Sequence, residues 1–143
     1  MTTTTSWNWP SRVLTTAGLA LVPWIFALAW VAGEHPAAWI GLDVMEATGL
    51  IGTGLLLARR DPRRVAVAPA TAVLLTVDAW FDVLTADPGT VLTAILMATC
   101  LELPLAALCT AVARDALRAL PRQLRNPWGI SGSARGQFTK ADL

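Results

Sequence analysis

Lysine and arginine are missing from two long stretches of this chain, 13–58 and 65–113. A water-soluble domain needs cations on such surfaces, whereas a lipid-facing surface excludes them, because a cation at the bilayer centre costs at least about 2.5–3.5 kcal/mol. The chain is also 55% hydrophobic and only 15% charged, while soluble domains are about 45–50% apolar and about 25% charged. We therefore expect a multi-pass protein of the cell membrane with no soluble domain.

Familiar catalytic and cofactor motifs are absent as well. The sequence has no Gly-rich phosphate loop, no nucleotide motif and no catalytic triad. It also lacks the Cys/His spacing of zinc sites and the Glu-x-x-His motif of di-iron bundles. The basic residues are grouped by membrane side, so the net charge of +1 does not indicate a nucleic-acid partner.

Four apolar segments, each close to the roughly 20 residues that cross a bilayer, predict an all-α bundle of four transmembrane helices. Their expected ranges are 13–32, 37–58, 65–85 and 90–113, which together form the bundle 13–113. Segment 1–12 is expected to lie at the cytoplasmic interface, and 114–143 is expected to form a basic cytoplasmic tail.

The arginines predict the orientation. Arg12 precedes the first segment, four arginines lie in 59–64, and six basic residues follow position 113, whereas the other two loops have none. By the positive-inside rule, both ends of the chain are cytoplasmic. The basic tail is also expected to contact anionic lipid headgroups.

Five acidic residues interrupt the predicted spans, and intramembrane acids usually face the interior of a bundle. They are Asp43 and Glu46 on the second span, Asp78 and Asp82 on the third, and Glu102 on the fourth. Spacings of three and four residues place the acids of each pair on one helix face. A helix rises about 1.5 Å per residue, so counting from the outer end of each span gives the depth of each acid in the membrane. The two acids of the second span and the two of the third lie in the outer half of the membrane, and Glu102 lies about 18 Å deep.

No Lys, Arg or His lies within a span to neutralise these acids. Five clustered carboxylates cannot all ionise in a low dielectric without compensation, so they are either largely protonated or hold a cation. Pro104 adds an oxygen ligand, because it cannot donate a hydrogen bond to the carbonyl of Cys100. Such oxygen ligands suit Ca, Mg or Mn ions. The sequence therefore predicts an outward-facing cation site of all five acids, for binding, sensing or transport of a metal ion or proton.

Three alternatives remain open at this point. Protonated acids would also serve as hydrogen-bonding contacts between helices. An integral-membrane cyclase or isomerase would use Asp78 or Glu102 as a general acid on a lipid or terpene, with aromatic side chains holding a carbocation. The chain would otherwise be a scaffold subunit docked through its tail. A homodimer is plausible under any of these, since the glycines of 37–58 offer a packing face.

Overall fold

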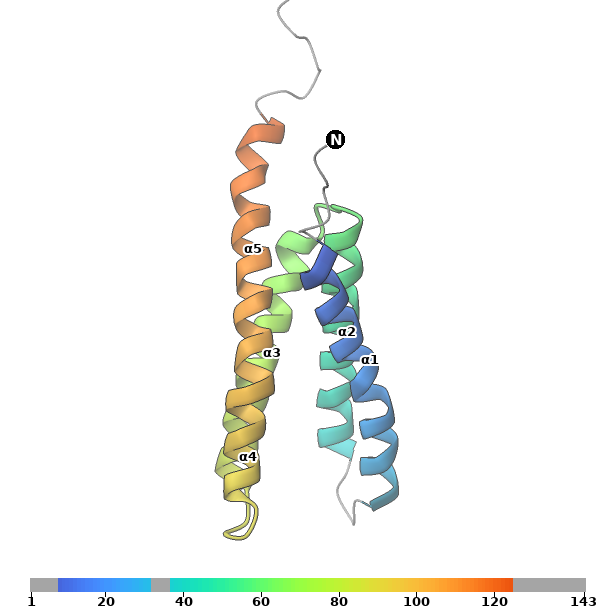
Figure 1. The fold of residues 1–143 in the computed structure, drawn as a ribbon, viewed down its shortest axis with the longest axis vertical. Coiled ribbons are helices and arrows are strands. Elements are labelled where there is room, and N and C mark those ends of the chain that lie inside the picture. Colours follow the sequence, from blue (N-terminus) through green and yellow to red (C-terminus); the bar gives the residue numbers. More distant parts are fainter. Residues whose placement is uncertain (1–7, 32–36, 125–143) are drawn as a thin grey trace, which may run out of the picture.

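The computed structural model describes residues 8–31 and 37–124, and the described chain is all-helical (Figure 1). The helices are α1 (Asn8–Val31), α2 (Ala37–Ala58), α3 (Arg64–Thr85), and a continuous run of α4 (Val91–Met97), the π-helical turn η2 (Ala98–Glu102) and α5 (Leu103–Leu124). The predicted all-α architecture is confirmed.

The helices form two antiparallel hairpins. In Figure 1, α1 packs along α2, and α3 packs along the run from α4 to α5. The hairpins meet through α2 and α3 near the 59–63 connection, and they separate towards the opposite end, where α1 ends and α4 begins.

Three helical segments are long and apolar enough to cross a membrane: Trp39–Ala58, Arg64–Thr85 and Val91–Leu120. These correspond to the second, third and fourth predicted spans. The first predicted span, 13–32, extends beyond the described residues and stays a prediction, as does the orientation. The structure describes the predicted interfacial segment 1–12 only from Asn8 onwards, and it describes the predicted tail 114–143 only up to Leu124.

The helix ends differ most from the prediction at two places. Helix α1 begins at Asn8, inside the segment predicted to be interfacial, and α5 runs on to Leu124. Pro10 is compatible with the early start. Proline has no backbone N–H, and N–H groups in the first turn of a helix have no carbonyl partner within the helix, so no hydrogen bond is lost. Helix α2 has the predicted bounds.

The two described turns are closed by local hydrogen bonds. After α2, Arg60 adopts a left-handed φ of 54°, the Arg60 N–H donates to the Leu57 carbonyl over 3.2 Å and the Asp61 N–H donates to the Leu56 carbonyl over 2.9 Å. This is a Schellman motif, which satisfies carbonyls at a helix end. After α3, the Thr90 N–H donates to the Asp87 carbonyl over 2.8 Å and starts the next helix.

The half of the bundle nearest the arginines is closely packed by small and polar residues. A Cβ on Gly18 would lie 2.8 Å from the Ala47 carbonyl oxygen, so the backbones of α1 and α2 approach each other closely here. The Ser11 hydroxyl donates to the Gly54 carbonyl over 2.8 Å, and the Thr53 and Thr71 hydroxyls lie 3.2 Å apart between α2 and α3. Close approach of this kind is typical of helices that associate in lipid, where the hydrophobic effect does not drive helices together.

Candidate cation site in the central cavity

A cavity of about 840 Å³ lies between the two hairpins, in the half of the bundle away from the arginines. Its lining comes from every helical segment: Ala17, Ala20, Leu21, Trp24, Trp39, Asp43, Glu46, Leu50, Leu75, Asp78, Asp82, Thr85, Ala86, Thr90, Thr93, Ala94, Met97, Leu101, Glu102 and Leu105. All five acids that the sequence singles out are among them. None of these lining residues is Lys, Arg or His.

The acids form two overlapping groups that share Asp78. One carboxylate oxygen each from Asp43, Glu46 and Asp78 lie within 4.8 Å of one another, and the same holds for Asp78, Asp82 and Glu102. The sequence predicts that Glu102 lies deeper in the membrane than the other four, and this depth stays a prediction. In the structure Glu102 lies close to both acids of α3, and Asp78 belongs to both groups.

Two carboxylates in this cluster have oxygens with no partner. Glu46 is 2% exposed and Glu102 is 8% exposed, and neither Glu46 Oε1 nor Glu102 Oε2 has a hydrogen-bond partner among the described residues. A buried polar atom without a partner costs about 1–3 kcal/mol, and more when it is charged. Such atoms in a cavity lining mark a place where a donor or a cation would be stabilised.

The π-helical turn directs Glu102 to its position. In η2 the Leu103 N–H donates to the Ala98 carbonyl, one residue farther back than in an α-helix. Such turns are rare overall, but they are frequent at functional sites. This one ends two residues before Pro104, which cannot donate the usual backbone hydrogen bond. Thr99, three residues before Glu102, is exposed, and its hydroxyl donates to the Ile95 carbonyl over 2.7 Å.

The aromatic residues divide into two sets. Trp24 and Trp39 line the cavity. Trp80 and Phe81 lie between the two acids of α3 in sequence, but they are 66% and 46% exposed and lie outside the cavity lining. The sequence does not predict that Trp24 and Trp39 line the same cavity as the acids, and it does not predict the volume of that cavity.

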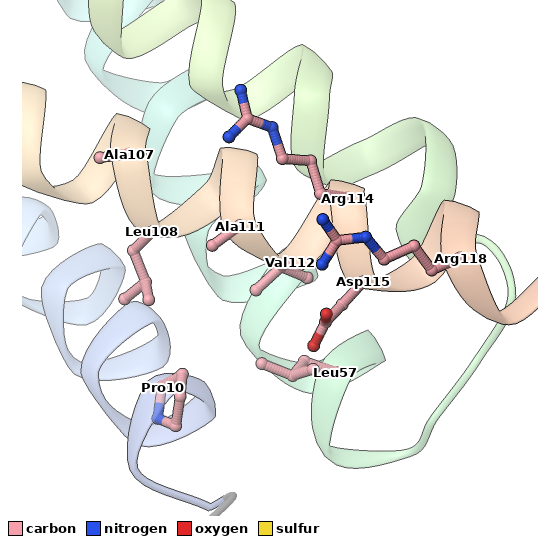
Figure 2. Close-up of a pocket in the computed structure, with 9 residues that line it drawn as sticks. All are labelled: Pro10, Leu57, Ala107, Leu108, Ala111, Val112, Arg114, Asp115 and Arg118. Atoms are coloured by element: carbon pink, nitrogen blue, oxygen red, sulfur yellow. The ribbon is translucent and has the colours of Figure 1, made fainter.

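A second, smaller cavity of about 330 Å³ lies at the arginine end, between α1, α2 and α5 (Figure 2). Pro10 and Leu57 contribute to it from α1 and α2, while the charged side chains of Arg114, Asp115 and Arg118 come from α5. It contains none of the five acids, and two of its three charged groups are cationic. This end of the molecule therefore has the opposite electrostatic character to the central cavity.

The chain matches no protein-family model, and no curated protein or solved structure shows significant similarity to it. The chemistry of the central cavity is therefore the main guide to function.

Proposed function

We propose that this protein is a multi-pass membrane protein that binds a cation through the carboxylates of its central cavity. The membrane part is supported by the outward faces of the helices. Phe26, Trp80 and Leu92 are 72%, 66% and 70% exposed, whereas soluble monomers rarely expose large contiguous apolar patches.

The polar side chains on those faces support the same environment. The exposed hydroxyls of Thr16, Thr48 and Thr99 each donate to the carbonyl one turn earlier, over 2.7–2.8 Å. A hydroxyl that is satisfied by its own helix needs no water and is compatible with hydrocarbon.

The observation that carries the cation proposal is the convergence of five acids with no basic residue among the cavity lining. Interhelical hydrogen bonding alone does not account for it, because Glu46 and Glu102 each keep a buried oxygen without a partner. A bound cation would neutralise the acids and satisfy those oxygens together.

The spacing suits a hard metal ion. Calcium binds oxygens at 2.3–2.6 Å, so two ligands on opposite sides of one ion are separated by up to about 5 Å. The oxygens of each acid group lie within 4.8 Å of one another. Magnesium and manganese bind at shorter distances, so the acids would have to close in around them. Cys100, whose carbonyl the sequence offers as a further oxygen ligand, is exposed and lies outside the cavity lining, so the carboxylates alone carry the proposal.

The test is divalent-ion binding by the purified full chain, measured by equilibrium dialysis with Ca²⁺, Mg²⁺ and Mn²⁺. Asp78→Asn is the decisive variant, because Asp78 belongs to both acid groups. Asp87→Asn is its matched control, since Asp87 is exposed in the α3–α4 turn and lies outside the cavity lining. We expect Asp78→Asn to weaken binding at least about tenfold, which corresponds to one lost charge-assisted contact, and Asp87→Asn to leave it unchanged.

Ion binding that is equally strong in both variants would contradict the metal site, as would binding of none of the three ions by the wild-type chain. Asp78→Asn keeps the shape of the side chain and most of its hydrogen bonding. If this variant loses ion binding while its circular dichroism spectrum is unchanged, the loss is due to the ionisable group itself.

A lipid-modifying enzyme is the second candidate, and the apolar lining of the cavity favours it. An olefin seated against Leu21, Leu50 and Leu75 would lie in the same cavity as Asp78 and Glu102. Either carboxylic acid would then donate its proton to the double bond, leaving a carbocation near Trp24 or Trp39. Mass spectrometry of lipids extracted from the purified protein tests this: a stoichiometric isoprenoid would support it, and bulk phospholipid alone would count against it.

A further inference from the structure

The central cavity is much larger than a metal ion requires. Metal–oxygen distances of about 2.0–2.6 Å confine an ion and its ligands to a small part of about 840 Å³. Sites for small organic molecules enclose about 300–1,000 Å³ and combine an apolar lining with a few polar groups. The volume of this cavity falls in that range.

The lining also has two chemically distinct parts. Acids from α2, α3 and η2 supply an uncompensated negative field, while the other lining residues are mostly leucine, alanine and tryptophan. A metal ion uses only the first part. A hydrophobic ligand without charge uses only the second and leaves the buried oxygens of Glu46 and Glu102 without partners.

We propose that the ligand of this cavity is an amphipathic organic cation, a protonated amine on an apolar body. The inference rests on the proposed cation site and names the class of its ligand. The ammonium group lies among Asp43, Glu46 and Asp78, and the apolar body lies against Leu21, Leu50 and Leu75 on the cavity wall.

Three features of the cavity have a counterpart in such a ligand. An ammonium N–H donates a charge-assisted hydrogen bond to a carboxylate oxygen, which satisfies the orphaned Glu46 Oε1. Trp24 and Trp39 also line the cavity, and aromatic rings of this kind attract a cation and bury an apolar group. The lining contains no Lys, Arg or His, so no side chain of the cavity competes with a bound ammonium group for the carboxylates.

The test uses three probes with one apolar cage and different charges: 1-adamantylammonium, 1-adamantanol and 1-adamantanecarboxylate. Binding to the full chain in detergent is followed by isothermal titration calorimetry, with Mn²⁺ titrated in parallel. We expect saturable binding of the ammonium, about ten- to hundredfold tighter than of the alcohol, and no binding of the carboxylate.

Variants locate the two parts of the site. Glu46→Gln is expected to remove the preference for the ammonium over the alcohol, with Asp87→Asn as the control. Trp39→Leu is expected to weaken ammonium binding about two- to thirtyfold, while Trp80→Leu leaves it unchanged, because Trp80 lies outside the cavity. Circular dichroism and gel filtration of each variant check that it is folded.

The outcomes separate this inference from the site on which it rests. Equal binding of all three probes, or an ammonium affinity unaffected by Glu46→Gln, would overturn the organic ligand. If Mn²⁺ binding then still depends on Asp78, the cation site itself stands. If neither Mn²⁺ nor ammonium binding depends on the acids, both proposals fall.

Discussion

Replacing Gly49 by alanine tests the close packing that holds the two hairpins together. A Cβ at this position would lie 2.6 Å from Thr71 Oγ1 and 3.1 Å from Thr71 Cγ2. Thr71 cannot turn away without cost, because its hydroxyl contacts the Thr53 hydroxyl at 3.2 Å and donates to the Val67 carbonyl over 2.9 Å. Helix α2 must therefore move away from α3.

The magnitude follows from two opposing effects. Overpacking a well-packed site costs about 1–3 kcal/mol, whereas alanine gains about 0.8–1 kcal/mol over glycine within a helix. Gly41 lies on the same helix and has nothing within 4 Å of an added Cβ, so Gly41→Ala keeps only the gain. We expect Gly49→Ala to be less stable than Gly41→Ala by about 1–3 kcal/mol in the free energy of unfolding.

The measurement is unfolding in sodium dodecyl sulfate, followed by far-ultraviolet circular dichroism, for both variants in one detergent. Thr71→Ala provides a second check, because it removes the two atoms nearest to the added Cβ. In the double variant, Thr71→Ala should restore part of the unfolding free energy that Gly49→Ala loses, and this difference is the coupling energy between the two sites. Equal stability of the two glycine variants would refute the packing of α2 on α3 described above.

Three further predictions concern the site, the orientation and the arginine end. At neutral pH a divalent ion at one hundred times its dissociation constant should stabilise the fold by about 2.7 kcal/mol. The resulting rise in melting temperature should shrink as the pH falls, since protons compete with the metal for the carboxylates; a rise that grows in acid would contradict this. In intact cells, a cysteine introduced at Gly89 should react with an impermeant maleimide and one at Pro62 should not, because the arginines lie on the Pro62 side; labelling at position 62 alone would invert the orientation. Arg114→Gln combined with Arg118→Gln should weaken retention on vesicles containing phosphatidylserine while leaving retention on phosphatidylcholine vesicles unchanged, since both arginines are exposed beside the smaller cavity; an equal effect on both lipids would exclude an electrostatic contact.

The sequence predicts most of the helices because their signals are local. Helix α2 lies between Pro36 and the arginines that begin at position 59, and its bounds follow directly from that composition. The convergence of the acids was also predictable, because three- and four-residue spacings fix the helix face, and an uncompensated acid avoids lipid.

The remaining features depend on packing between segments that are distant in sequence. Pro104 indicates a disturbance in the fourth helical segment, but it does not show that the disturbance is a π-helical turn that joins Glu102 to Asp78. The cavity volume follows from the way the hairpins separate, and this separation depends on where small residues allow close approach. No periodicity in a single helix contains that information.

The bundle divides into a packed half and a hollow half, and substitutions in the two halves have different consequences. The contacts that hold α1, α2 and α3 together involve Ser11, Gly18, Gly49, Thr53 and Thr71. The cavity lining shares none of these residues. Variants of the acids should therefore change ligand binding while the packed half keeps the fold. Gly18 and Gly49 directly adjoin the lining residues Ala17 and Leu50, so these sites are not independent of the cavity. A shift of α2 in Gly49→Ala should therefore change ligand affinity together with stability.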